Sequence, residues 1–437
     1  MQRIERIYSS RLFQPIFLPV LAALVLLAYS NTFSASFQFD DQPSITENES
    51  IRSLANVPAL LMGQRGVTMA SFALNYAMGG LDVAGYHVVN VSIHILNAMA
   101  AYFLVLGIFR DEDEARAKKV AAFSALIFAL HPVQTQAVTY IVQRMESLAA
   151  LFYLLGLLAF RRAAFASTWL RRGLLYAATS AFYVLGFYSK ETAFTFPFAA
   201  LLYDFYFIGK GSFQKVFSRW PVYLALFALM LFFTAHDIVP MSGFGDLSRD
   251  SSIIASLKGG PPAASMAAAN AHPAATAGFA VEGISPEEYL FTQFDVIVYY
   301  ISLLFVPMNQ NLDYDFPLAK TLFKVPEAHR GAVLNIPMLP PAASLAILLF
   351  ILASGVYLFL RSRKASAGAK KTDCLAASFF IFWFFLILAP TSSFFPIADV
   401  IFEHRLYLST LGFAVILVVA VDRLLGLVSE RMRKRPA

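Results

Sequence analysis

Two adjacent carboxylates, Asp40 and Asp41, follow the first long apolar stretch of the chain. A carboxylate within hydrogen-bond reach can act as a general base and accept the proton of an attacking hydroxyl group. Taken alone, an acidic pair in this position is more often part of a solvated loop or a helix cap. A catalytic role for the pair therefore requires other charged groups on the same side of the protein.

Three further clusters of charged residues stand beside the ends of apolar stretches. They are Arg144 with Glu146, Lys190 with Glu191, and Glu403 with His404 and Arg405. Ionisable groups at the membrane face of a helix bundle are costly, about 2.5–3.5 kcal/mol each at a helix centre, so they are candidates for function. The alternative for the first two clusters is a structural ion pair within each.

Basic side chains opposite an acidic pair suit the transfer of a group from a lipid phosphate. Arginine and lysine neutralise the phosphate that leaves, and the planar fork of arginine matches two phosphate oxygens. Phosphate is already a weakly basic leaving group, so electrostatic stabilisation rather than a strong general acid would be the main catalytic contribution. A polyprenyl tail on that phosphate would explain why such an enzyme resides in the bilayer.

Histidine and asparagine residues mark two other apolar stretches. One helical face of the stretch 84–109 carries, at spacings i, i+3, i+7 and i+10, His87, Asn90, His94 and Asn97. Such a stripe is typical of interhelical hydrogen bonding rather than of a metal site, because the two histidines lie two turns apart. His131 ends another apolar stretch, where it either caps and packs a helix or supports the acidic pair.

The composition requires a membrane protein. Hydrophobic residues make up 58% of the 437 positions and charged residues 14%, whereas a soluble domain carries roughly 25% charged residues. The apolar residues form blocks long enough for a helix to cross about 30 Å of hydrocarbon. We therefore predict an all-α polytopic bundle of about ten or eleven transmembrane helices, with spans near 13–30, 84–109, 120–137, 147–160, 173–189, 192–208, 221–236, 342–360, 375–393 and 406–425.

Most of the basic residues gather in alternate loops, as the positive-inside rule requires of cytoplasmic segments. These segments are 1–11, 110–119, 161–172, 209–219, 361–371 and the basic tail 426–437. The net charge of +6 therefore reflects membrane orientation rather than a nucleic-acid partner. With this orientation the acidic pair and all three charged clusters fall at the extracytoplasmic end, and we expect a bacterial inner membrane with a periplasmic active face.

Two extracytoplasmic segments are too long to be simple turns. The segment 31–83 is expected to be a loop with amphipathic helices on the membrane surface, and 237–341 contains an Ala/Gly/Pro-rich run, 255–280, that we expect to be mobile. Within the latter, the charge alternation favours a re-entrant or interfacial helix at 289–306, and an eleventh span is the alternative. Residues 1–425 thus form one transmembrane domain.

Six sequence blocks, in order, resemble the transmembrane and TPR-repeat O-mannosyltransferases and their bacterial relatives. The first, "FQFDDQPSITENESIRSL" (37–54), is similar to the acidic first-loop motif of that family. The others are "SFALNYAMGGLDVAGYHVVNVSIHILNA" (71–98), "LIFALHPVQTQAVTYIVQRMESLAALFYLLGLLAF" (126–160), "YSKETAFTFPFAALLYDF" (188–205), "QFDVIVYYISLLFVPMNQNLDYDFPL" (293–318) and "PTSSFFPIADVIFEHRLYLSTLGF" (390–413).

The resemblance implies a GT-C glycosyltransferase fold and a polyprenyl-phosphate sugar donor. It makes Asp40 and Asp41 the catalytic pair, and although it does not decide which is the base, Asp41 is our choice. It implies that the donor phosphate meets Arg405, His404, Arg144 and Lys190. The supporting residues of the active face would be Glu146, Glu191, Glu403, His131, Asp313, Tyr314 and Asp315.

The predicted reaction moves a hexose, mannose in that family, to a protein hydroxyl, with a lipid or glycan acceptor as the alternative. The chain ends at "ERMRKRPA" without the TPR array of many relatives, so its own loops or a separate partner would select the acceptor. No cofactor is firmly expected; Asp40, Asp41 and His131 make an incomplete ligand set, so we do not favour a divalent metal. Functions of other classes are a transporter or lipid flippase, and a non-catalytic assembly factor.

Overall fold

The computed structural model describes residues 7–239, 277–278, 281, 283–327, 336–366 and 368–433. These residues are mostly helical, and the only β pairing among them is a single bridge between Ala277 and Ile397. Six of the described helices are long and apolar enough to cross a membrane, or seven if one bent pair is a single span. The predicted all-α polytopic fold is confirmed, and the larger total of ten or eleven spans stays a prediction.

The helices of the bundle follow the apolar blocks closely. They are α2 (Phe13–Ala28), α5 (Val83–Ile108), α6 (Glu114–Leu130), α7 (Thr135–Thr139), α8 (Arg144–Ala164), α9 (Trp169–Phe187), α10 (Phe196–Tyr203), α12 (Trp220–Phe233), α17 (Pro341–Lys364), α18 (Ala369–Leu388) and α19 (Thr410–Arg433). The first loop adds α3 (Val57–Leu61) and α4 (Gly66–Gly79), and α16 (Pro286–Phe305) precedes α17. Most of the run 255–280 lies outside the described residues.

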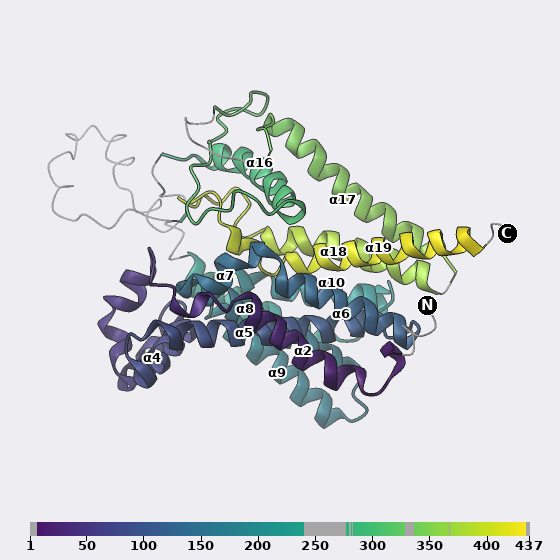
Figure 1. Ribbon diagram of the computed structural model, residues 1–437, viewed down its shortest axis with the longest axis horizontal. Helices are drawn as coiled ribbons and strands as arrows, with labels where there is room; N and C mark the ends of the chain where they lie inside the picture. Colours follow the sequence, from purple (N-terminus) through teal and green to yellow (C-terminus); the bar gives the residue numbers. More distant parts are fainter. Residues whose placement is uncertain are drawn as a thin grey trace.

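The two ends of the molecule differ in character. Figure 1 shows the start of α2 and the last turns of α17 and α19 at one end, whereas α4 and α7 lie toward the other. We call the first the basic end, which contains the connections 109–113, 165–168, 209–212 and 365–368. The second is the loop end, which contains 29–82, 131–143, 188–195 and 389–409.

Ion pairs fasten the helices to one another at the basic end. The Arg116 guanidinium of α6 lies 2.7 Å from the Asp373 carboxylate of α18 and 3.0 Å from the Asp422 carboxylate of α19. Arg423 also pairs with Asp373, and Lys119 lies 2.5 Å from Asp422. Opposite charges that are partly removed from water and share several partners stabilise this junction more than an isolated surface pair would.

The polar stripe of α5 binds the loop end together. His87, Asn90, His94 and Asn97 are all fully buried. The His94 Nε2 atom lies 2.9 Å from the Ala129 carbonyl, so it carries the proton, and Nδ1 accepts a bond from the Tyr407 hydroxyl at 2.7 Å. Asn97 donates to the Ser147 carbonyl at 2.7 Å. The stripe therefore forms interhelical hydrogen bonds, as predicted.

A break interrupts the expected span 120–137. The helix α6 ends at Leu130, and Pro132–Thr139 continues at an angle of 54° to it. His131 is extended, with φ −67° and ψ 128°, because the ring of a following proline disfavours the helical conformation. The Val133 amide donates to His131 Nδ1 at 3.2 Å, which caps the new turn. The break directs residues 135–140 into the loop end.

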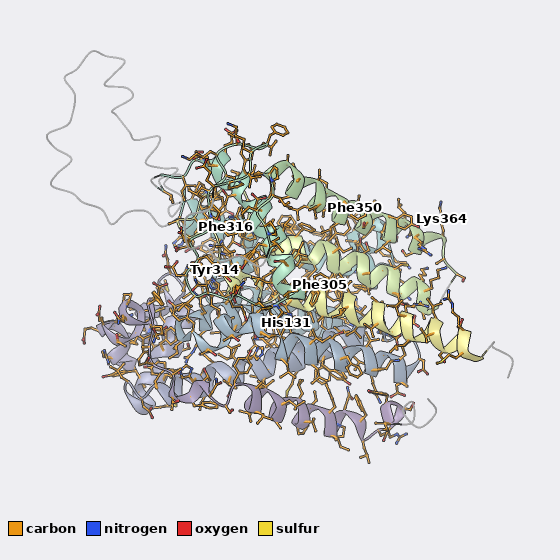
Figure 2. The ribbon with its side chains drawn as sticks, turned by 45° about the horizontal axis from the view of Figure 1, so that its top comes forward. His131, Phe305, Tyr314, Phe316, Phe350 and Lys364 are labelled. Atoms are coloured by element: carbon orange, nitrogen blue, oxygen red, sulfur yellow. The ribbon has the colours of Figure 1, made fainter. Side chains whose placement is uncertain are left out.

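The helix α16 begins and ends at the loop end. Near its start the Tyr289 hydroxyl donates to the Thr391 carbonyl at 2.6 Å, just beyond the end of α18. At its other end the Leu304 carbonyl accepts a bond from His131 Nε2 at 2.9 Å. In Figure 2, Phe305 lies close to His131, whereas Lys364 lies at the far end of α17. Within this structure α16 does not cross the bundle.

A substitution in the stripe should destabilise the protein. His94→Phe removes both ring hydrogen bonds, so the Ala129 carbonyl loses its His94 donor and the Tyr407 hydroxyl keeps only its contact with Asn97. We expect the free energy of unfolding to fall by about 1–3 kcal/mol, the cost of unsatisfied buried polar groups. Unfolding in detergent micelles, followed by circular dichroism, measures the change. Ser92→Ala is the control, because Ser92 bonds only within α5 and is exposed. Equal stability of the two variants would contradict this assignment.

Candidate active site

A cavity of about 440 Å³ opens at the loop end. The first loop, the segment 135–140, the segment 310–312 and Glu403 each supply part of its wall. Its lining residues are Ala35, Ser36, Gln38, Asp41, Thr135, Gln136, Thr139, Tyr140, Gln310, Asn311, Leu312 and Glu403. Carboxylates, amides and hydroxyls predominate, and this lining includes no lysine, arginine or histidine. Such a wall is suited to hydrogen bonds with hydroxyl groups.

Asp41 is the buried member of the acidic pair. Its side chain is 1% exposed. One carboxylate oxygen accepts the Gln38 amide at 2.9 Å, and the other accepts the Val142 amide at 2.7 Å. Burial raises the pKa of Asp41 to about 6, and the charge of Asp40 adds to the rise, while the amide donors oppose it. A carboxylate with this pKa changes its protonation state near neutral pH.

Asp40 lies beside the Tyr140 hydroxyl, which its carboxylate also contacts. It is exposed and does not line the cavity, and its amide donates to the Tyr140 hydroxyl at 2.8 Å. The preceding residue, Phe39, has a positive φ of 38° and is 59% exposed. A bulky residue with this φ is conformationally strained, and such residues often lie at functional sites. The turn at Phe39 places the two adjacent carboxylates in different environments.

Glu403 organises the opposite wall. It is 2% exposed and accepts hydrogen bonds from the Gln310 amide group at 2.5 Å, the Asn311 backbone amide at 2.9 Å and the Tyr314 hydroxyl. Burial raises its pKa, although these three donors oppose the rise. Asn309, at the start of this segment, has a positive φ of 51°. One carboxylate therefore holds the segment 310–314 against the bundle.

Gln136 connects the two walls. Its side-chain oxygen accepts the His404 backbone amide at 2.7 Å and lies 3.0 Å from His404 Nδ1, while its amide nitrogen donates to the Leu312 carbonyl at 3.2 Å. His404 is 4% exposed. Burial lowers the pKa of His404 well below its usual value, and the charges of Lys190, Arg405 and Arg65 lower it further. His404 is therefore neutral and lies within reach of three cationic side chains.

The predicted ion pairs form with different partners. Lys190 lies 2.9 Å from Glu146, not beside its neighbour Glu191. Glu191 instead pairs with Arg65 at 3.2 Å. The pairings within each cluster are therefore corrected, because residues that are adjacent in sequence project in different directions once their helices pack. Arg65, like Phe39, is a bulky residue at the loop end with a positive φ, here 51°.

Arg144 lies apart from the cavity. It is fully buried, and its nitrogens donate to the Asn90 side chain at 2.7 Å, the Tyr86 carbonyl at 3.1 Å and Ser71. Its guanidinium also lies 4.6 Å from the centre of the Phe72 ring. These contacts join α8 to α4 and α5. Its proposed contact with the donor phosphate stays a prediction.

Arg405 and His131 also form hydrogen bonds with backbone groups near the cavity. Arg405 donates to the Val400 carbonyl at 3.0 Å and the Asp399 carbonyl at 2.6 Å. The ring nitrogens of His131 are engaged by the Val133 amide and the Leu304 carbonyl. Both residues therefore fix the segments that carry Glu403 and Gln136, whatever further contact they make with a substrate.

Three carboxylates outside the cavity lie near its rim. Asp313 and Asp315 are exposed, and Figure 2 shows the intervening Tyr314 below Phe316 at the loop end. Burial raises the pKa of Asp399, and the charges of Asp313 and Asp40 raise it further. Two predicted site residues, Asp313 and Asp40, thus lie near Asp399, a residue that the sequence analysis did not select. Among the described residues, no group of three histidine, cysteine, aspartate or glutamate side chains is arranged to hold a metal ion; metal independence stays a prediction.

Neutralising Glu403 should weaken the hydrogen bonds that hold the segment 310–314. Glu403→Gln replaces one acceptor oxygen by an amide NH2 group. This donor then faces another donor from the segment 310–314, so one hydrogen bond is lost. We expect amide hydrogen exchange at Asn311 to accelerate about tenfold, the effect of about 1.4 kcal/mol of lost protection. Glu191→Gln removes the same charge from the Arg65 pair and serves as control. Unchanged exchange at Asn311 in Glu403→Gln would show that the carboxylate does not hold the loop.

Comparison with known proteins identifies relatives of part of the chain. Protein O-mannosyl-transferase Tmtc1 of Drosophila melanogaster is 35% identical over 156 residues, which is 32% of this chain and 18% of that protein. TMTC2 of Mus musculus is 33% identical over 158 residues, and TMTC4 of Homo sapiens is 29% identical over 167 residues. These alignments cover 18% and 22% of the two relatives, respectively.

The chain spans about a fifth of the length of the curated relatives that it matches. No family model matches the chain. No solved structure matches it either. Over about a third of its own length, the chain is similar to the TMTC protein O-mannosyltransferases, in agreement with the resemblance of its sequence blocks.

Proposed function

We propose that this chain is a membrane glycosyltransferase that moves a hexose from a polyprenyl phosphate to a protein hydroxyl. The observation that carries the proposal is the Asp41 carboxylate, which is buried in the wall of a polar cavity and has a pKa raised to about 6. The relatives named above, which are protein O-mannosyltransferases, support a sugar as the transferred group. We further propose that the loop end faces the periplasm of a bacterial cell.

In the proposed reaction the acceptor hydroxyl enters the cavity beside Asp41. The carboxylate takes the hydroxyl proton while the hydroxyl oxygen forms a bond to the anomeric carbon of the sugar. The bond between that carbon and the phosphate oxygen breaks, the oxygen keeps the electron pair, and the polyprenyl phosphate leaves as an anion. The amide and hydroxyl groups of Gln136, Gln310 and Tyr140, which line the cavity, would orient the sugar.

The phosphate that leaves requires positive charge, which the cavity lining does not supply. We propose that the cationic side chains of Lys190 and Arg65 meet it, beside the neutral His404. Lys190 and Arg65 are close enough to lower the pKa of His404, and the Arg65 side chain is 39% exposed. A cation that is only partly covered by its partner Glu191 can approach a phosphate oxygen more readily than Arg144, which is engaged on every side.

Loss of the base should abolish transfer. Asp41→Asn keeps one acceptor oxygen for the Gln38 or Val142 amide but cannot take a proton, so we expect transfer to fall about 10²–10⁴-fold. The assay uses membrane vesicles supplied with a polyprenyl-phosphate hexose and a hydroxyl-bearing peptide. Asp82→Asn is the control, because Asp82 only caps α5 and asparagine caps equally well. Transfer by Asp41→Asn at the control rate would refute the proposed base.

The pH dependence of the transfer rate should reflect the ionisation of Asp41. A base must be deprotonated, so the rate of transfer should rise with pH up to about 6 and level off above it. The charge of Asp40 raises the pKa of Asp41, so Asp40→Asn should move the midpoint to lower pH. Single-turnover rates measured across the acid range test both statements. A midpoint that does not move, or that moves upward, would contradict the assignment of this titration to Asp41.

A further inference from the structure

A second cavity, of about 530 Å³, lies at the basic end of the bundle. It is bounded by residues near the ends of α5, α8, α17 and α18 and by α10 with the turn that follows it. None of its lining residues belongs to the cavity that contains Asp41. Neither the sequence blocks nor the proposed reaction assigns it a role.

Positive charge predominates in this cavity. Its lining contains two acidic residues, Asp111 and Glu112, and five basic ones, Arg110, Arg161, Lys210, Arg363 and Lys371. The Asp111 carboxylate lies 3.5 Å from Arg110 and 3.1 Å from Lys210, and Glu112 engages Thr372 and Arg116. Within the described part of the chain, Arg161, Arg363 and Lys371 have no carboxylate partner. The cavity therefore has unneutralised positive charge.

The local backbone positions two of these arginines. Arg161 packs against Gly107, where a Cβ atom would lie 2.7 Å from the arginine Nε, and donates to the Gly107 carbonyl at 3.3 Å. Arg363 donates to the Lys210 carbonyl at 3.3 Å. Lys210 and Gly211 both have positive φ, 51° and 78°. Each guanidinium is thus held at the wall with other N–H groups left to bind a ligand.

The Tyr203 hydroxyl is the second, independent indication of a ligand. Tyr203 lines the cavity and is 0% exposed. Its hydroxyl group has no hydrogen-bond partner in the part of the chain that the structure describes. A buried hydroxyl without a partner is costly, and a bound oxygen-rich group would remove that cost. By contrast, the neighbouring Tyr206 hydroxyl is paired with Ser378 at 2.9 Å.

We propose that this cavity binds a phosphate group, with Arg161, Arg363 and Lys371 supplying the charge and the Tyr203 hydroxyl donating a hydrogen bond. Arginine forks match phosphate oxygens, and basic pockets between spans bind anionic lipid headgroups. Phe165 lies at the rim, 53% exposed, with the Arg110 guanidinium 4.5 Å from the centre of its ring. The phosphate has two sources, a lipid headgroup or a soluble anion at this end of the membrane.

Lipid titrations of the purified full chain in detergent test the site. Phosphatidic acid, inorganic phosphate and diacylglycerol are added separately, and the shift in melting temperature and native mass spectrometry report binding. Phosphatidic acid should stabilise the protein, and diacylglycerol, which lacks phosphate, should not. Arg161→Gln combined with Lys371→Gln should weaken phosphatidic acid binding about tenfold, and Tyr203→Phe about fivefold. Arg171→Gln, exposed at the same end and outside the cavity, is the charge control.

The outcomes separate the sources of the phosphate. Binding of phosphatidic acid alone, with the predicted losses, supports the site and assigns it to a lipid headgroup. Binding of inorganic phosphate as well, with the same losses, supports a site for the phosphate group itself. Tyr203→Phe removes a hydroxyl that has no partner among the described residues, so the variant should fold. Unweakened binding by this variant and by the double variant would overturn the proposal. Equal weakening by Arg171→Gln would likewise overturn it, because it would show only general attraction to the basic end.

Discussion

The loop end depends on the buried hydrogen bonds of one helix, α5. His87 bonds to the Ala35 carbonyl at 2.9 Å, just before the acidic pair. The Asn90 side chain donates to the Val138 and Ile141 carbonyls, each at 3.2 Å. The next residue, Val142, donates its amide to the Asp41 carboxylate. Each carbonyl would be costly if left unsatisfied in an apolar interior. The polar face of a single helix therefore determines where separate segments meet and where the cavity forms.

The two buried carboxylates of the cavity have different tasks. Glu403 accepts three donors from one segment and fixes the wall. Asp41 accepts two backbone amides and faces the cavity beside hydroxyl and amide groups. Lys190, Arg65 and Arg405 are not among the lining residues; the first two are paired with carboxylates, and Arg405 donates to carbonyls. The geometry thus separates a region suited to hydroxyl groups from a region suited to negative charge.

Periodicity and charge alternation predicted the helices and the hydrogen-bonding role of the α5 stripe, because these depend on residues close in sequence. The partners of the charged residues were not predictable in the same way. Lys190 pairs with Glu146 and Glu191 with Arg65 across different helices. Gln136 and Gln310 are neutral residues in segments with many other polar side chains, and only their three-dimensional placement distinguishes them. The positive φ of Phe39 and Arg65 likewise has no signature in residue type, whereas asparagine, as at Asn309, often adopts this conformation.

The length of α6 has a consequence for the surrounding membrane. The helix has 17 residues before the break at His131 and Pro132, so it is about 25 Å long at 1.5 Å per residue. The hydrocarbon core of a bilayer is about 30 Å thick. Either the bilayer thins beside α6 or the polar turn after Pro132 lies within the depth of the acyl chains. In the second case a substrate anchored in the lipid reaches the exposed Thr135 by lateral diffusion, while a water-soluble partner must descend to it.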